Sequence, residues 1–138
     1  MHTARFARFV SLAAVALFAA GGCSSSDLPK LSTVSGVVTL DGAPYPNAYV
    51  MFAPAKGRPS EGVTDSSGTY ELSFLPGVKG AELGEHKVSI TTQYQAPENP
   101  GSEPPFVEPL PPKYNVASTL TATVTSGSNE VNFDLTSR

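Results

Sequence analysis

The chain has 138 residues, and its nine Lys and Arg against twelve Asp and Glu give a formal net charge of −3 at pH 7. It has no tryptophan, two histidines and one cysteine, Cys23. Acids and bases are spread along the sequence without the basic cluster that neutralises phosphates, which argues against a nucleic-acid partner. One cysteine cannot form an internal disulfide, so the domain is expected to fold without one.

The first 22 residues have the pattern of a secretory signal peptide, expected to be helical. Residues 1–8 contain Arg5 and Arg8 and no acid, and residues 9–20 (FVSLAAVALFAA) form an apolar run that small residues follow. A basic start, a short apolar stretch and a small-residue exit are typical of such a segment. A membrane-spanning helix needs about 20 apolar residues, and this run is shorter.

The segment Ala20-Gly21-Gly22-Cys23 follows the apolar run. It resembles the lipobox of bacterial lipoproteins, with Ala20 where leucine is commoner. The resemblance implies cleavage before Cys23, a diacylglyceryl group on its thiol and acylation of its amino end. Several acyl chains, at about 0.8 kcal/mol per buried methylene, hold a protein firmly on a bilayer. Ordinary cleavage after Gly21 or Gly22, leaving a free thiol, is the alternative.

Removal of residues 1–22 leaves 116 residues and a net charge of −5, because Arg5 and Arg8 are lost from the nine basic residues while all twelve acids remain. This length suits one domain. Residues 23–33 are polar and contain a proline, and we expect a lipidated tether that places the domain, residues 34–138, just off the membrane. Ser24 resembles the residue that sorts some lipoproteins to the outer membrane, so the expected location is the cell envelope, at the outer rather than the inner membrane.

From residue 34 onward, apolar and polar residues alternate with a period of two, as in half-buried strands. The segments are 34–40, 48–54, 69–74, 87–94, 119–125 and 130–135, with a shorter one near 60–64. Turn residues separate them at Asp41-Gly42, Asp65–Gly68 and Ser126–Asn129. Seven short strands with one apolar face each need a second sheet to cover that face. The prediction is an all-β fold, a single seven-stranded antiparallel β-sandwich of Ig-like type.

The stretch from Val34 to Ser73 resembles the carboxypeptidase regulatory-like domain, a transthyretin-type (prealbumin-like) sandwich. The matching positions are Gly36, Asp41, Gly42, Ala48, Val50, Thr64, Asp65, Gly68 and Tyr70. The end of the chain resembles the last strands of small lipoproteins built on this domain, so the likeness covers residues 34–135. It implies the fold and a domain without catalytic residues of its own.

Catalytic and metal-binding constellations are not found. His86 is the only histidine after the signal peptide, and we interpret it as a solvated strand-edge residue, since a zinc hydrolase needs three protein ligands. Asp65 with two serines is too few oxygens for calcium, so it is interpreted as a turn. A transthyretin-like enzyme that hydrolyses 5-hydroxyisourate has a site with two histidines, an arginine and a C-terminal Tyr-Arg-Gly-Ser. This chain lacks that tetrapeptide and has no second histidine after the signal peptide. The prediction is a protein that is not an enzyme and has no metal or cofactor.

Residues 95–113 (QAPENPGSEPPFVEPLPPK) form a proline-rich insertion between two predicted strands, with seven prolines among nineteen residues. A connection this long is functional or disordered, and proline density favours extended polyproline II. One interpretation is a presented recognition strip whose partner-binding residues are Phe106, Leu110, Glu103 and Glu108. The other is a stiffened crossover in which Phe106 or Leu110 covers one end of the sandwich. Tyr114, just after it, is expected to close the core.

Two function classes follow. The first is a membrane-anchored, non-catalytic interaction or structural module that contacts envelope proteins or cell-wall polymer. The second is an accessory lipoprotein that binds a small molecule or carbohydrate. A concave aromatic cluster with convergent polar groups would favour the second class.

Overall fold

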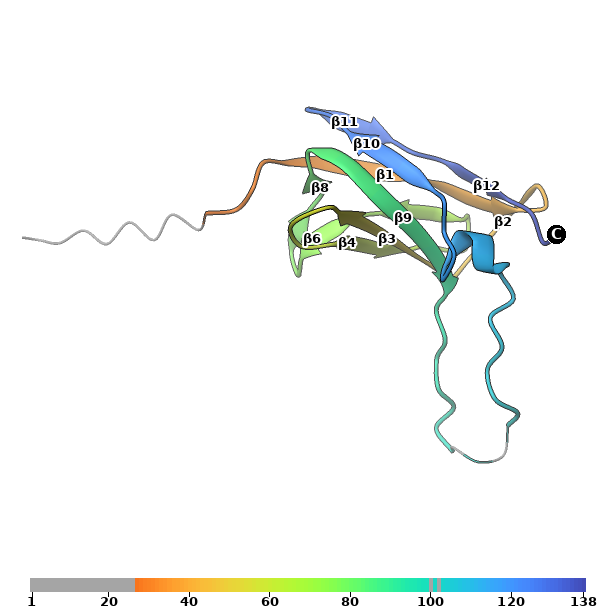
Figure 1. The fold of residues 1–138 in the computed structure, drawn as a ribbon. Helices are drawn as coiled ribbons and strands as arrows, with labels where there is room; N and C mark the ends of the chain where they lie inside the picture. The colour runs from red at the N-terminus through yellow and green to blue at the C-terminus, as the bar shows by residue number, and fades with distance from the viewer. Residues whose placement is uncertain (1–26, 100, 102) are drawn as a thin grey trace, which may run out of the picture.

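The computed structural model describes residues 27–99, 101 and 103–138. The predicted signal peptide, Cys23 and the start of the tether lie outside these residues. Figure 1 shows two layers of strands, with a long loop extending away from them on one side. None of the helices in the described part of the chain has the length and apolar character needed to cross a membrane.

The first sheet is organised around β1 (Leu31–Leu40), with which all five of its other strands pair. On one side the partners are antiparallel: β2 (Ala43–Pro44), β5 (Thr69–Glu71) and β8 (Ala81–Glu82). On the other side they are parallel: β11 (Ser128–Glu130) and β12 (Phe133–Leu135). The last strands of the chain therefore lie beside the first.

The second sheet is antiparallel and has the order β10-β9-β3-β4-β6-β7. Its strands are β3 (Ala48–Pro54), β4 (Ser60–Val63), β6 (Ser73–Leu75), β7 (Val78–Lys79), β9 (Gly84–Thr92) and β10 (Thr121–Val124). The longest pairing joins β3 to β9, from Ala48 opposite Thr92 to Pro54 opposite His86. A short 3-10 helix, η1 (Pro112–Tyr114), precedes β10.

The core lies between the sheets and consists of the apolar residues that the alternation places inward. Fully buried members are Val34, Val38, Ala48, Val50, Phe52, Leu72, Ala81, Val88 and Ile90. Phe133 packs with its ring centroid 6.2 Å from that of Phe52 and 6.3 Å from that of Tyr70. Tyr114 is buried as predicted. The predicted all-β sandwich is confirmed.

The structure differs from the prediction in the number and the pairing of strands. The described residues form twelve strands rather than seven, and β11 and β12 run parallel to β1, so the pairing is not wholly antiparallel. Residues 69–74 were expected to form one strand, but β5 pairs with β1 whereas β6 joins the other sheet. Likewise the Ser126–Asn129 turn links β10 to β11 across the two sheets and is not a hairpin. Strand β1 begins at Leu31, three residues early. Inward residues of both sheets face the same core, so alternation does not reveal which sheet a segment joins.

Gly36 allows a close crossing between β1 and the Val131-Asn132 step that separates β11 from β12. A Cβ atom on Gly36 would lie 1.8 Å from the carbonyl oxygen of Val131. That oxygen accepts a hydrogen bond from the Tyr70 hydroxyl at 2.6 Å, and the Asn132 side chain accepts one from the Val37 N–H at 2.8 Å. Only glycine fits at position 36.

The Asp65–Gly68 turn joins β4 to β5 and orders its own backbone. Oδ1 of Asp65 accepts hydrogen bonds from the Ser67 N–H at 2.9 Å and the Thr69 N–H at 3.0 Å, as well as from the Ser67 hydroxyl. The Ser67 and Thr69 donors lower the pKa of the Asp65 carboxyl below its ordinary value. The structural interpretation of this motif is confirmed.

Candidate binding sites on the arm and the outer sheet face

The most prominent surface feature is the loop that connects β9 to η1, residues 93–110, named here the arm. Figure 1 shows it leaving the sandwich and returning beside itself, far beyond the body of the strands. The described residues of the arm contain no helix or strand. A proline-rich segment of this kind forms few internal backbone hydrogen bonds.

Two aromatic side chains pair across the arm. The ring centroids of Tyr94, on the outgoing limb, and Phe106, on the returning limb, are 4.7 Å apart with planes inclined by 33°. The side chains remain 49% and 42% exposed, respectively, and Val107 is 80% exposed. An offset aromatic pair of this kind is attractive by about 0.5–1.5 kcal/mol beyond its buried area. The pair therefore holds the two limbs together and presents apolar surface to solvent.

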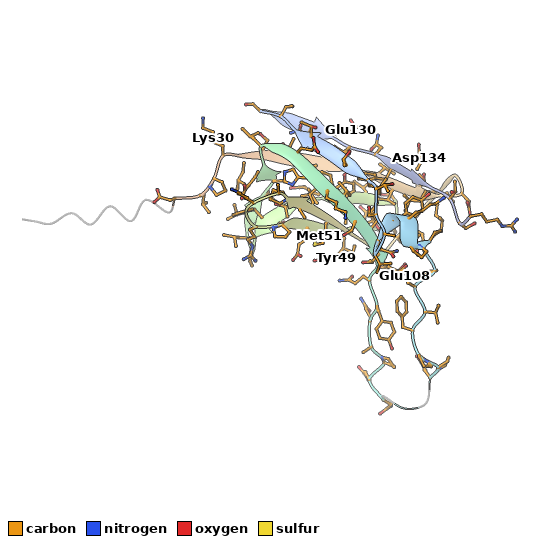
Figure 2. All side chains as sticks on the ribbon, in the orientation of Figure 1. Lys30, Tyr49, Met51, Glu108, Glu130 and Asp134 are labelled. Atoms are coloured by element: carbon orange, nitrogen blue, oxygen red, sulfur yellow. The ribbon has the colours of Figure 1, made fainter. Side chains whose placement is uncertain are left out.

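The root of the arm is fixed by the carboxylate of Glu108. Its Oε2 accepts a hydrogen bond from the Thr92 N–H at 2.9 Å, and its Oε1 accepts from the Thr92 hydroxyl at 2.7 Å and the Leu110 N–H at 3.0 Å. The Tyr45 hydroxyl extends the network to Thr92 at 2.7 Å. Glu108 lies where the arm meets the sandwich (Figure 2). Charge-assisted bonds of this kind are the stronger ones.

The four predicted partner-binding residues thus divide into two pairs. Phe106 and Glu103 are exposed. Leu110 is only 2% exposed and belongs to the core, so its assignment to a partner surface is wrong: it covers one end of the sandwich, the role given by the alternative interpretation. Glu108 uses both carboxylate oxygens to attach the arm. Of the two residues that the alternative interpretation named, Leu110 covers the end of the sandwich, whereas Phe106 packs on Tyr94 of the arm.

The prediction that His86 is a solvated edge residue is wrong. It is 1% exposed, because it alternates in phase with the buried Val88 and Ile90 and therefore points into the core from β9, between Pro54 of β3 and Ala122 of β10. Its ring lies 5.8 Å from that of Phe52, and its Nε2 is 2.7 Å from the carbonyl oxygen of Glu82. Within the described residues, no group of His, Cys, Asp and Glu is placed to hold a metal ion.

The outer faces of the two sheets differ in chemistry. The face of the β1 sheet carries Thr33, Ser35, Thr39, Glu71, Glu130 and Asp134. The face of the β3–β9 sheet carries Tyr49, Met51, Ala53, Val63 and Leu75, partly exposed, among polar residues. Figure 2 shows Glu130 and Asp134 on one side of the molecule and Tyr49 and Met51 on the other.

Two hollows open on the β3–β9 sheet. One, of about 330 Å³, lies over β3, β4 and β6, and its lining includes Tyr49, Arg58, Glu61, Ser73 and Gln93. The Tyr49 hydroxyl donates a hydrogen bond to Glu61; burial, this bond and the Glu61 charge raise the pKa of Tyr49 to about 12. The other, of about 450 Å³, lies beside β9 and β10.

No protein-family model matches the chain, and no curated protein is significantly similar to it. The crystal structure of a DUF3823 family protein from Parabacteroides merdae ATCC 43184 matches with a TM-score of 0.44 and 19% identity. The match covers 78% of this chain and 46% of that one, so the chain spans less than half the length of that protein.

Proposed function

We propose that this protein is a lipid-anchored component of the cell envelope that binds another envelope component, a protein or the cell-wall polymer, without catalysis. The observation that carries the proposal is the exposed Tyr94–Phe106 pair, presented on an arm whose root is fixed by Glu108. Exposed aromatic side chains are enriched where proteins bind partners. Fixing the root reduces the ordering cost of binding.

The anchor in this proposal is a lipid on Cys23, supported by the lipobox-like segment Ala20–Cys23 and the basic and apolar stretches before it. The sandwich is proposed to be a carboxypeptidase regulatory-like domain. Two of the positions that carry the resemblance have clear structural roles, which supports this assignment. Gly36 lies beneath the Val131 carbonyl, and Asp65 orders a turn. The outer membrane is the proposed location.

The place of the arm supports a partner other than the anchoring bilayer. The described chain enters at one end of β1, whose ten residues span about 33 Å. In Figure 1 the arm leaves near the opposite end of the sandwich, close to η1 and the C-terminus. A protein anchored at Cys23 would therefore carry its arm on the side away from the membrane.

The experiment places a photo-crosslinking amino acid at position 106 of the full chain in its own envelope. A control chain carries it at position 130, on the opposite outer face (Figure 2). We expect a discrete crosslinked product from position 106, absent from position 130 and reduced by Tyr94→Ala. Equal crosslinking from both positions would contradict the arm as the contact surface.

The anchor has its own test. Cys23→Ser should move the protein from the membrane fraction to the soluble fraction of the envelope and abolish the mobility shift that acylation causes. Ser25→Ala serves as the matched control within the same serine run. If the Cys23→Ser protein remains in the membrane fraction with unchanged mobility, the lipoprotein proposal is wrong.

A further inference from the structure

The 330 Å³ hollow over β3, β4 and β6 brings together polar groups from four parts of the chain. Glu61 and Val63 lie on β4, between Tyr49 of β3 and Ser73 of β6. Arg58, from the loop between β3 and β4, also lines the hollow. These side chains reach the same space because alternate residues of paired strands share a face.

Several of these groups have unused hydrogen-bonding capacity. Arg58 uses Nε to donate to the Phe74 carbonyl at 3.1 Å, which fixes the guanidinium and leaves its two terminal nitrogens free. Glu61 accepts from Tyr49 through Oε2, which leaves Oε1. Among the described residues, the Ser73 hydroxyl and the Gln93 side-chain amide, which line the same hollow, make no hydrogen bond. The hollow therefore presents both hydrogen-bond donors and acceptors to a ligand, and the bonds to Phe74 and Tyr49 hold Arg58 and Glu61 in place.

The charge of the hollow is balanced. Arg58 contributes a positive charge and Glu61 a negative one, yet they do not form an ion pair, since the ion pair found among the described residues joins Lys79 to Glu71 at 3.4 Å. The guanidinium donates hydrogen bonds and the carboxylate accepts them. Together they therefore suit a neutral ligand group that can both donate and accept a hydrogen bond. Hydroxyl groups have this property. An anionic ligand would gain from Arg58 but be repelled by Glu61 and by the net negative chain.

The remaining lining is apolar: the ring of Tyr49 and the side chains of Val63, Leu75 and Pro76. A pyranose ring combines C–H faces, which pack on aromatic and aliphatic surface, with a rim of hydroxyls. We propose that this hollow binds a neutral sugar ring, free or within a glycan chain. Tyr49 and Leu75 pack on the ring, while Arg58, Glu61 and Ser73 bind its hydroxyls.

This proposal is independent of the arm's partner. The larger hollow of about 450 Å³ does not suit the same ligand, because its lining has no Tyr or Phe and is built from Ala53 to Ala55, Glu85 to Lys87 and Ser118 to Thr121. Tyr49 of β3 and Arg58 of the loop between β3 and β4 line the hollow, whereas Tyr94 and Phe106 belong to the arm. Variants of Tyr49 and Arg58 therefore test the sugar site, and variants of Tyr94 and Phe106 test the partner contact of the arm, so that either proposal can fail without the other.

The test is ligand-observed saturation-transfer NMR on the detergent-solubilised full chain, with glucose, cellotetraose and glucuronic acid as probes. Glucose and glucuronic acid differ only at C6, so they compare a neutral with an anionic sugar. We expect glucose to bind with a dissociation constant of about 1 mM and glucuronic acid more weakly. Tighter binding of cellotetraose than of glucose would assign the site to a glycan chain, and equal binding to a free sugar.

Arg58→Gln and Tyr49→Ala should each weaken glucose binding by about tenfold or more. The matched controls Lys56→Gln, in the same loop, and Tyr94→Ala, on the arm, should leave it unchanged. Arg58 is exposed, so Arg58→Gln should keep the thermal transition of the parent chain. The proposal is overturned if neither glucose nor cellotetraose binds, if glucuronic acid binds more tightly than glucose, or if binding is lost in Tyr94→Ala but kept in Arg58→Gln.

Discussion

The sandwich and the arm are stabilised in different ways. The sandwich has a core of fully buried apolar residues and joins β1 to the end of the chain, as in the hydrogen bond from Thr39 to Asp134 at 2.7 Å. The described residues of the arm bury one side chain, Leu110, and depend on the Glu108 carboxylate and one aromatic pair. Stability and the proposed partner contact therefore depend on separate sets of residues, so a substitution should affect one without the other.

Gly36→Ala should have the largest effect on the sandwich. The new Cβ would lie 1.8 Å from the Val131 carbonyl oxygen, so β1 and the β11–β12 step cannot keep their present approach. We expect a loss of more than about 4 kcal/mol in the free energy of unfolding, measured by urea denaturation. Gly42→Ala, where a Cβ meets nothing within 4 Å, should cost about 1 kcal/mol from its positive φ alone. Equal losses would contradict the close approach.

Phe133→Ala tests the core itself. Removing this ring deletes its contacts with Phe52 and Tyr70 and leaves a cavity between the sheets. The expected loss is about 3–4 kcal/mol in the same measurement. A protein that tolerates this truncation would not have the inward faces described here.

Tyr70→Phe removes one hydrogen bond from the buried crossing at Val131 and should cost about 1–2 kcal/mol. Burial raises the pKa of the Tyr70 hydroxyl, so its contribution to stability is complete below the tyrosine pKa of the unfolded chain and is lost as the pH rises above it. The difference in melting temperature between parent and Tyr70→Phe should therefore shrink in alkaline buffer. A difference that is constant from pH 8 to pH 11 would contradict this linkage.

Glu108→Gln should loosen the arm more than the sandwich. In either orientation the new amide nitrogen, a donor, faces a backbone N–H, that of Thr92 or that of Leu110, at a cost of about 1 kcal/mol. Hydrogen exchange should accelerate at the amides of Thr92 and Leu110, while those of β3 keep their protection. Uniform acceleration would show that the arm and the sandwich unfold as one unit.

Phe106→Ala should have the smallest effect on stability, about 0.5 kcal/mol, the low end of what an aromatic pair contributes, because the side chain is exposed and lies outside the core. Its effect should appear in crosslinking from the arm instead. A large drop in melting temperature would show that the Tyr94–Phe106 pair supports the fold, and the separation between the two regions would be lost.

Much of the sandwich could be predicted because its inward residues obey a local rule. The alternation at Val34, Val38 and Val50 marks the core without knowledge of strand partners. Pairing depends on contacts about 95 residues apart in the chain, such as the parallel register of Val38 with Phe133. His86 is a different case: it alternates in phase with Val88 and Ile90, which predicts an inward side chain, whereas its polar character alone suggests exposure to solvent.

The arm could be predicted as an exposed segment from its prolines, but the division of roles within it could not. Glu103 and Glu108 look alike in sequence, and only the position of Thr92 distinguishes the attachment residue from the exposed one. The hollow with Arg58, Glu61 and Ser73 was also not predicted. Its members are ordinary polar residues of a sheet face, and only the pairing of β4 with β3 and β6 brings them together.

The position of β1 at the centre of its sheet has a consequence for the order of folding. Every other strand of that sheet pairs with β1, and two of them, β11 and β12, come from the last residues of the chain. A chain that emerges N-terminus first cannot complete this sheet until nearly all of it is present, and distant pairings of this kind form slowly. If the chain is exported, as proposed, slow closure would keep the polypeptide unfolded while it crosses the membrane, and the sandwich would form on the far side.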